Sequence, residues 1–487
     1  MIKQTIDIGF NFENTYINLT KILRQKINPV PVQSPRLVIF NNRLAKDLGL
    51  NVNSVTENDL SNLFSGNKLP TGSEPLAQAY CGHQFGHFVM LGDGRAIVLG
   101  EHLTPSGKRI DIQFKGSGRT PYSRSGDGRA ALGPMLREYI ISEAMHGLNI
   151  PTTRSLAVVA TGEMVQREVA LQGAVLTRVA SSHLRVGTFQ YLAARQDIKS
   201  LKELVNYTIK RHYPEFINSK NQALELLRIV IKKQAYLIAE WMRVSFIHGV
   251  MNTDNMTISG ETIDYGPCAF MDYYDPKTVF SSIDLHGRYA FGNQPNIAEW
   301  NLARFAEAIL PLFDLDNKKA ISIAEQEINN FKDIFKNNFT TMMKGKLGLI
   351  SNEIEDDKLM KDLFQLMFEN EADYTNTFVY LMNGSVPQEE LIKDKNFIEW
   401  KNKWNSRLSR NQDIIKAKEL MTKNNPIIIP RNHLIESALS KAEQGNLDEF
   451  NKLILALKDP YQDNEQLTGL KNPAPRSEKK YQTFCGT

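Results

Sequence analysis

The sequence predicts an α+β protein with two lobes, a strand-rich part followed by a helix-rich part. Three observations support this prediction. Short segments of alternating apolar and polar residues, separated by glycine-rich turns, lie mainly between residues 76 and 180. Apolar stripes at helical spacing begin at Ala223 and recur to about residue 450. A polar loop, residues 248–266, directly follows the first long helical segment.

Composition describes an ordinary globular chain with room for two or three core-forming units. The 487 residues are 42% hydrophobic and 23% charged, with a formal net charge of +4. This small excess is spread among helices of mixed charge, so it favours neither nucleic acid nor a membrane as a partner. No apolar run approaches the roughly 20 residues that span a bilayer, and no secretory signal is visible. Three scattered cysteines do not make a disulfide framework, so we expect a cytoplasmic protein.

Residues 1–75 are rich in turns and are interpreted as an N-terminal extension with one weak helix at about residues 42–50. In the strand-rich part, Asp93-Gly94 lies between two extended segments and predicts a hairpin. Its glycines would let backbone N–H groups approach phosphate oxygens. Cys81, His83 and His87 raise a metal site as an alternative, which the surrounding loop and strand pattern disfavours.

Residues 109–115 alternate between apolar and polar side chains, which predicts a strand with Lys115 facing away from the apolar layer. A single lysine in this position is commonly a solvated residue on an edge strand. In protein kinases, however, a strand lysine binds phosphates and pairs with a glutamate of the next helix. A helix is predicted here over residues 130–145, with Glu138 as the expected partner and Glu143 as runner-up.

Basic residues recur between and after these elements. The loop at residues 116–129 holds three arginines and four glycines, which is typical of an anion-facing loop, although Asp127 within it also suits the N-cap of the helix. Strands are predicted over residues 155–161 and 174–180, the second carrying Arg178, and Arg185 follows in a loop. Several converging arginines would suit a site that holds a triphosphate at more than one end.

The polar loop, HGVMNTDNMTISGETIDYG, follows a helix predicted over residues 223–244. Two short runs joined across Gly260-Glu261 predict a second hairpin, with Asp264 just past it. Kinases use the same order: a loop that opens with His and closes with a metal-binding Asn, a hairpin, then Asp-aromatic-Gly. Asn255 and Asp264 would supply the oxygen ligands that Mg²⁺ prefers.

One position in this loop departs from the kinase pattern. The catalytic Asp of kinases lies five residues before the Asn, and Val250 occupies that position here. Asp254 is the spare carboxylate, so the loop either does different chemistry with Asp254 or does none. A polar turn with self-satisfied side chains is the structural alternative. The boundaries we predict are 76–180 for an N-lobe, 181–320 for a C-lobe and 321–487 for a helical C-terminal region to which no chemistry is assigned.

Longer strings of residues add a family resemblance. GHQFG, LGDGRA, QFKGSGRTPYSRSGDGRAALGPMLREY, HGVMNTDN, DYGPCAF and GRYAFGNQP resemble the selenoprotein O family, also called SelO or YdiU, and cover residues 75–315 densely. The resemblance implies a pseudokinase fold that transfers AMP from ATP to Ser, Thr or Tyr hydroxyls of proteins. It also implies that ATP binds in reverse orientation relative to kinases, which accounts for Val250, and that Mg²⁺, or else Mn²⁺, assists.

The resemblance also assigns roles to individual residues. Asp254 would be the base, Asn255 and Asp264 would bind the metal, and Glu138 would pair with Lys115. Cys485, third from the end, occupies a position where some members carry selenocysteine, and the resemblance implies a disulfide with Cys268; two ordinary thiols are the alternative. The residues implied to contact the nucleotide are Gly92, Gly94, Arg95, Lys115, Asp127, Gly128, Arg178, Arg185 and Asp264.

Two other functions fit the same residues. A conventional kinase would transfer the γ-phosphate, and a non-catalytic pseudokinase would bind the nucleotide only. ATP labelled at the α or γ position would distinguish transfer of AMP from transfer of phosphate.

Overall fold

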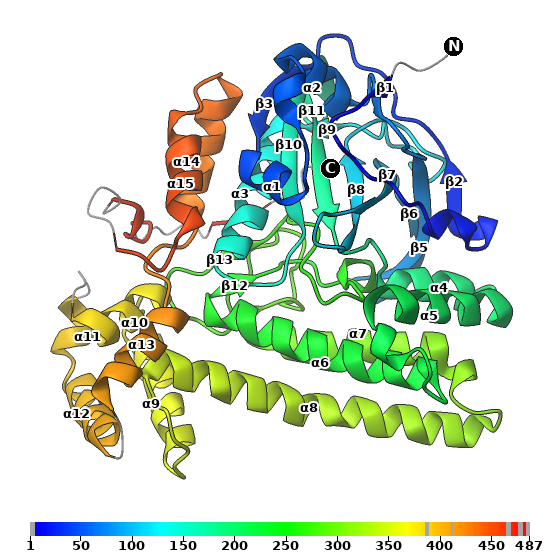
Figure 1. Ribbon diagram of the computed structural model, residues 1–487. Coiled ribbons are helices and arrows are strands. Elements are labelled where there is room, and N and C mark those ends of the chain that lie inside the picture. Colours follow the sequence, from blue (N-terminus) through cyan, green and yellow to red (C-terminus); the bar gives the residue numbers. More distant parts are fainter. Residues whose placement is uncertain (1–4, 385–388, 411–412, 464–468, 476–480, 484–487) are drawn as a thin grey trace.

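A computed structural model describes residues 5–384, 389–410, 413–463, 469–475 and 481–483. A sheet-containing lobe lies against a lobe built from helices, so the predicted α+β fold with a helical C-terminal region is confirmed (Figure 1). Among the described residues no helix combines the length and the apolar character needed to cross a bilayer.

The N-lobe is organised around a sheet of nine described strands. Its order is β2-β5-β7-β8-β11-β10-β3, with β6 paired to β5 and β9 paired to β11. Every neighbouring pair is antiparallel. The strands are β2 Arg24–Lys26, β3 Arg36–Phe40, β5 Leu76–Gln84, β6 His87–Gly92, β7 Ala96–Leu103, β8 Arg109–Lys115, β9 Ala130–Ala131, β10 Arg154–Gln166 and β11 Ala170–Ala180. Two short pairs lie apart from it: β1 Thr5–Ile6 with β4 Leu69–Pro70, and β12 Phe246–Ile247 with β13 Ala269–Phe270.

The predicted lysine strand is β8, and it lies in the middle of the sheet. β8 pairs with β7 on one side and β11 on the other, and Lys115 at its end lies opposite Ala96 and Leu176. Ile112 and Phe114 are fully buried on one face, while Lys115 is on the other. Only 5% of Lys115 is exposed, so the interpretation as a solvated edge lysine is wrong.

The first 75 residues, predicted as an N-terminal extension, contribute two strands to this sheet. β2 pairs with β5 and β3 pairs with β10, so the N-terminal segment supplies both end strands. The weak helix expected at residues 42–50 is α1, Asn42–Asp47, and α2, Glu57–Ser65, follows it. Both helices contribute to a hydrophobic core on the sheet face that carries Phe114.

The hairpin predicted at Asp93-Gly94 is wrong. β6 pairs with β5 from Gln84 opposite His87 back to Ala79 opposite Gly92, so the turn is Phe85-Gly86. Both turn residues have positive φ, 51° and 88°, as a tight two-residue hairpin requires. Phenylalanine rarely adopts this conformation, which is why a rule based on Asp-Gly misplaced the turn. Asp93-Gly94 instead connects β6 to β7, both of which pair with β5.

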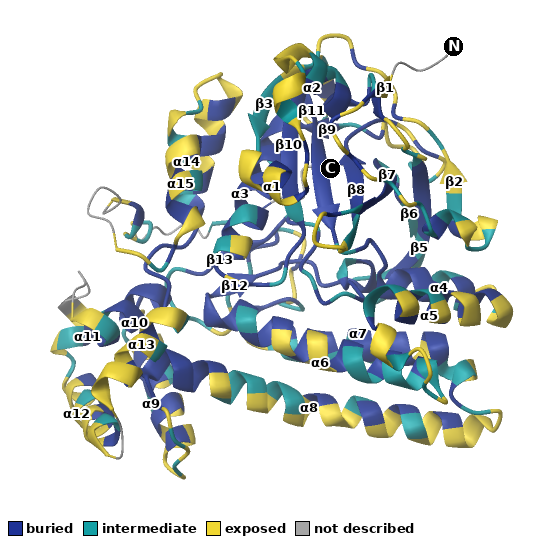
Figure 2. Cartoon of the chain, in the orientation of Figure 1, coloured by how far each residue is buried: buried dark blue, intermediate teal, exposed yellow. Residues whose placement is uncertain are grey.

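The second lobe consists of helices below the sheet. α6 and α8 run along the length of this helical lobe, and each helix buries one face and exposes the other (Figure 2). The predicted helix at residues 223–244 is α6. The helices are α3 Leu132–Gly147, α4 Val186–Ala193, α5 Ile198–His212, α6 Gln222–Arg243, α7 Gln294–Ile309, α8 Asn317–Leu347, α9 Asp356–Glu369, α10 Tyr374–Asn383, α11 Glu389–Lys393, α12 Lys395–Ser409, α13 Ile414–Asn424, α14 Asn432–Glu443 and α15 Asp448–Lys458.

The last two helices return to the N-lobe. α14 and α15 pack against α3, beside the sheet and away from α8 (Figure 1). Residues of α3, α6, α14 and α15 belong to the same hydrophobic core. The C-terminal region is therefore split, with α8 to α13 extending the helical lobe and α14 and α15 covering α3.

Candidate nucleotide site

A cavity of about 540 Å³ lies between the sheet and the helical lobe. Seven cationic side chains and four carboxylates line it, together with glycines of the loops at residues 92–94 and 126–128. Such an excess of positive charge suits a polyphosphate. The cations are Arg95, Lys115, Arg124, Arg129, Arg167, Arg178 and Arg185, and the carboxylates are Asp93, Asp127, Asp254 and Asp264.

Glu138 of α3, rather than Glu143, lies next to the strand lysine. Lys115 Nζ donates to Glu138 Oε2 at 2.6 Å, and Arg178 Nε of β11 donates to Glu138 Oε1 at 2.8 Å. Burial opposes ionisation of Glu138, but Arg178 and Lys115 outweigh it and lower the pKa of this carboxyl. Glu143 instead pairs with Arg154 at 2.7 Å, outside the cavity.

Asp264 accepts hydrogen bonds from the same group of cations. Lys115 Nζ lies 3.1 Å away and Arg178 Nη2 2.6 Å away from Oδ1, and Arg185 Nη1 lies 3.2 Å from Oδ2. Burial would raise the pKa of Asp264, but Arg178, Lys115 and Arg185 together hold it well below its ordinary value. The residue has φ of +63°, a strained conformation typical of functional positions.

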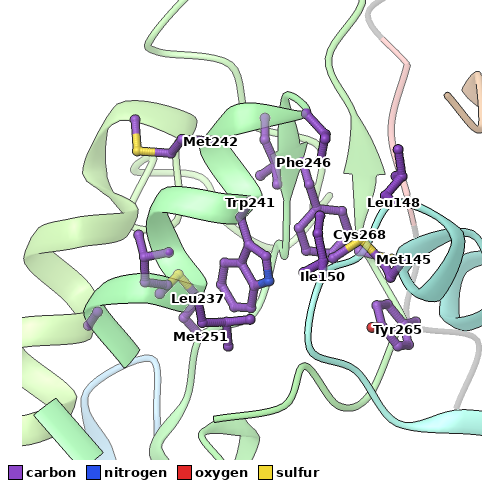
Figure 3. Packing of buried hydrophobic residues seen from close by; sticks show 14 of the residues in the cluster. Met145, Leu148, Ile150, Leu237, Trp241, Met242, Phe246, Met251, Tyr265 and Cys268 are labelled. Carbon is purple, nitrogen blue, oxygen red and sulfur yellow. The ribbon is translucent and has the colours of Figure 1, made fainter. Parts of the chain in front are cut away.

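Hydrophobic packing fixes the chain around Asp264. The next residue, Tyr265, is buried in a cluster with Met145 of α3 and Phe246 of β12 (Figure 3). The rings of Phe246 and Trp241 of α6 are 5.4 Å apart, and those of Phe246 and Tyr265 are 6.2 Å apart. The cluster therefore connects α3, which carries Glu138, to the segment that carries Asp264.

Asp254 and Asn255 lie in a single 3-10 turn at Thr253–Asn255. Asp254 is buried, and its Oδ1 has no hydrogen-bond partner among the described residues. Burial raises the pKa of its carboxyl to about 6. Asn255 Nδ2 donates to the carbonyl of Val250 at 2.9 Å, which directs its amide oxygen away from that carbonyl. Arg185 Nη1 donates to the backbone oxygen of Asp254 at 2.9 Å.

The hairpin predicted between Asn255 and Asp264 does not form as a strand pair. Thr257 and Thr262 make isolated bridges to other segments, with Arg185 and Thr152 respectively. The turn is closed by a side chain: Thr257 Oγ1 accepts from the N–H of Glu261 at 2.9 Å and donates to its carbonyl at 2.6 Å. A threonine side chain thus replaces the ladder bonds that the alternating pattern predicted.

The glycine-bearing loops pack on each other at the cavity wall. A Cβ on Gly92 would lie 2.4 Å from the ring of Tyr122, and one on Gly128 would lie 2.2 Å from the carbonyl of Gly118. Gly94 and Arg95 also line the cavity. Loop packing therefore requires at least two of these glycines, whatever their backbone N–H groups bind.

Asp127 is not the N-cap of α3, which corrects that alternative. The cap position is Ala131, and Asp127 pairs with Arg167 of the β10–β11 turn at 2.9 Å. Its hydrogen bond with Arg167 lowers the pKa of Asp127. The loop at residues 116–129 is therefore tied to the neighbouring strand connection, and its arginines stay at the cavity.

Sequence reasoning missed Asp93 as a site residue. It lines the cavity, is 2% exposed, and its Oδ1 has no partner in the described chain. Burial raises the pKa of its carboxyl to about 6. Its position between Gly92 and Gly94 looked like turn chemistry, so no signal in the sequence distinguished it. Tyr80, whose ring lies 4.5 Å from the Arg185 guanidinium, was missed as well.

The residues considered for metal binding separate into two groups. No described cluster of three His, Cys, Asp or Glu side chains could hold a metal, which excludes Cys81, His83 and His87 as a site. Asn255 and Asp264, the residues predicted to bind a metal, offer an amide oxygen and a carboxylate at the same cavity. Such oxygen donors fit a hard divalent cation.

Of the two cysteines expected to form a disulfide, one lies within the described residues and the other does not. Cys268 is buried four residues after Asp264, whereas Cys485 lies outside the described residues. The tail is described at Thr483, whose hydroxyl donates to the carbonyl of Pro267 at 2.6 Å and whose N–H donates to that of Phe280 at 2.8 Å.

The order of lysine strand, glutamate helix, polar loop and Asp-Tyr-Gly around one cationic cavity defines a kinase-like nucleotide-binding protein. A family model described as "Protein adenylyltransferase SelO" matches residues 7–458. Proteins described as "Protein nucleotidyltransferase YdiU" are 59% identical in Nitrosococcus oceani (99% of this chain, 98% of that protein) and 58% identical in Pelagibacter ubique (99% and 100%). The chain belongs to the SelO/YdiU family of protein nucleotidyltransferases.

Solved structures show a weaker likeness. ROP2 from Toxoplasma gondii, described as having a protein-kinase fold and no enzymatic activity, is 9% identical, covers 69% of this chain and 87% of its own, and has a TM-score of 0.24. A Toxoplasma gondii rhoptry antigen kinase domain is 10% identical, with 70% and 89% coverage and a TM-score of 0.22. Both scores are low, so the kinase-like description depends on the arrangement of elements given above.

Proposed function

We propose that this protein transfers AMP from ATP to Ser, Thr or Tyr hydroxyls of other proteins. Membership of the family establishes protein nucleotidyl transfer as the coarser function. One observation carries the finer proposal: a cavity with a marked excess of cations contains a buried carboxylate with an unpaired oxygen, Asp254, in the polar loop that corresponds to the kinase catalytic loop. Such a carboxylate can take a proton from a hydroxyl.

The lining of the cavity supports ATP bound in the reverse of the kinase orientation. A conventional kinase needs an apolar slot for adenine beneath the sheet. Here the loop residues Arg124, Arg129 and Arg167 are part of the cavity lining, and guanidinium groups suit terminal phosphates far better than a purine. With the β- and γ-phosphates held by these arginines, the α-phosphate would be the one presented to Asp254.

The proposed reaction assigns a step to each group. Asp254 takes the proton of the acceptor hydroxyl, whose oxygen bonds to the α-phosphorus as the bond to pyrophosphate breaks. Lys115, Arg178 and Arg185 stabilise the charge that develops on the phosphate oxygens. Asn255 and Asp264 would hold Mg²⁺ or Mn²⁺, which when bound neutralises phosphate charge and helps to keep nearby carboxylates ionised.

Labelled ATP tests this proposal. The protein is incubated with a mixture of candidate protein acceptors and ATP labelled at either the α- or the γ-phosphate. We expect the α label, and not the γ label, on protein, with none transferred by Asp254→Asn. Transfer of the γ label would support a conventional kinase instead. No transfer of either label, with ATP still bound, would support a non-catalytic pseudokinase.

We also propose that the C-terminal tail regulates this site through a Cys268–Cys485 disulfide. Thr483 is bonded to Pro267, which directly precedes Cys268. Cys485 is the second residue after Thr483, and two residue steps reach at most about 7 Å. Peptide mapping under non-reducing conditions, with Cys81 as an internal control, should recover the linked pair, and its absence after oxidation would contradict the proposal.

We further propose a cytoplasmic location, which suits a protein that uses ATP and has only three cysteines.

A further inference from the structure

The tip of the β5–β6 hairpin is bonded to the two residues that precede Asp254. His83 N–H donates to Thr253 Oγ1 at 2.7 Å, and Phe85 N–H donates to Asn252 Oδ1 at 3.1 Å. Alternate backbone N–H groups of the strand end are therefore received by side chains of consecutive loop residues. The hairpin and the loop are about 170 residues apart in sequence, so these bonds connect the two lobes.

Gln190 of α4 completes a closed ring of hydrogen bonds. Thr253 Oγ1 lies 2.8 Å from Gln190 Oε1, and Gln190 Nε2 lies 2.9 Å from His83 Nδ1. Because the threonine hydroxyl accepts from the His83 N–H, its single proton is available for the Gln190 oxygen. Thr253 is fully buried and Gln190 nearly so. In this setting each lost partner leaves a buried polar group unpaired, which is costly.

The residues on either side of His83 lie close to Asp254. A Cβ on Gly82, the residue before His83, would lie 2.0 Å from Asp254 Oδ1. Gln84, the residue after His83, lines the nucleotide cavity together with Asp254. The strand end thus lies directly over the carboxylate. A shift of the hairpin tip would change both the space and the polarity around Asp254.

His83, Gln190 and Thr253 do not line the nucleotide cavity, whereas Gln84 and Asp254 do. We propose that these three residues are positioning residues: they latch the hairpin tip to the catalytic loop and set the orientation of Asp254. This inference rests on the proposed role of Asp254 as the base. A displacement of about 1 Å at a reacting group is enough to lower a rate by roughly 100-fold.

Paired variants at Thr253 separate the latch from nucleotide binding. Thr253→Val keeps the shape and removes the hydroxyl, and Thr253→Ser keeps the hydroxyl. We expect the valine variant to lower kcat for AMP transfer at least about 10-fold with the Kd for ATP changed less than about threefold, and the serine variant to retain most of the rate. Thr375→Val, which removes a buried hydroxyl with no partner among the described residues, is the matched control.

Three results would overturn the latch: a wild-type kcat in Thr253→Val, a loss confined to the Kd for ATP, or a serine variant as slow as the valine variant. If Thr253→Val does not fold, Gln190→Met removes the same ring from α4 and takes its place. Retention of wild-type kcat by that variant would count equally against the proposal.

Hydrogen exchange gives a second readout that does not depend on activity. The amides of His83 and Phe85 should be protected in the wild type and should exchange at least about 10-fold faster in Thr253→Val or Gln190→Met. Unchanged exchange would overturn the latch. Failure of the wild type to transfer AMP, with the exchange result as expected, would instead remove the proposed function and leave the hairpin contact in place.

Discussion

Replacing Asp254 with asparagine is expected to abolish transfer and to make the protein more stable at neutral pH. Burial raises the pKa of Asp254 from an ordinary value of 3.8 to about 6, so the folded state holds this proton more tightly than the unfolded state. The free energy of unfolding therefore falls as the pH rises from 3.8 to 6, and the full cost is present above pH 6. At about 1.4 kcal/mol per tenfold change in proton affinity, that cost is about 3 kcal/mol.

Denaturant unfolding of the metal-free and nucleotide-free protein measures this gain. Asp254→Asn should exceed the wild type by about 3 kcal/mol at pH 7.5 and by about half of that near pH 5. Asp356→Asn is the opposite control, because Asp356 is buried but paired with Arg407 at 2.7 Å and its pKa is lowered. It should lose stability. An Asp254→Asn protein that is no more stable than the wild type at pH 7.5, or whose gain does not depend on pH, would refute this reasoning.

Three further predictions follow from the contacts at the site. Glu138→Gln should lower the free energy of unfolding by about 3–5 kcal/mol and abolish the ATP-dependent rise in Tm. The control Glu143→Gln should keep that rise in Tm. Equal ATP-dependent Tm shifts in the two variants would contradict this prediction. Gly82→Ala should stop AMP transfer, because the added methyl would overlap the catalytic-loop carboxylate, and an active variant would be evidence against the close approach. Removing residues 481–487 should speed hydrogen exchange at the amide of Ser282, which donates to the carbonyl of Thr483; unchanged exchange would show that the tail does not protect this amide.

Elements with strong periodicity were predictable from the sequence, and their pairing partners were not. The alternation at residues 109–115 identified β8, and the apolar stripe starting at Ala223 identified α6. In contrast, β2 and β3 are three and five residues long and belong to the sheet only through contacts with β5 and β10. The Phe85-Gly86 turn was missed for a related reason, since tertiary contacts with the catalytic loop hold phenylalanine at positive φ.

The candidate site also combines residues that the sequence reveals with residues that only the structure reveals. Chemistry carried by residue type and spacing, such as Lys115 with Glu138 and the Asp-Tyr-Gly segment, is recognisable in the sequence alone. Asp93 is not, because an aspartate between two glycines is ordinary turn chemistry and its significance lies in its burial at the cavity. The ring of His83, Gln190 and Thr253 joins three separate elements, and no local pattern encodes it.

The unpaired carboxylate oxygen of Asp254 argues for catalysis rather than nucleotide binding alone. Lys115, Arg178 and Arg185 share Asp264 and lie at a cavity with further arginines, an arrangement that would suffice to bind a nucleotide. A buried carboxylate with an unpaired oxygen adds nothing to the affinity for a polyanion, and a pKa raised to about 6 corresponds to a cost of about 3 kcal/mol at neutral pH. The loop that carries Asp254 is nevertheless held in place, because hairpin N–H groups donate to Thr253 and Asn252, and Arg185 donates to the backbone oxygen of Asp254. A residue that costs stability, opposes the ligand's charge and lies in a loop held by these bonds is best explained by a proton that it must remove.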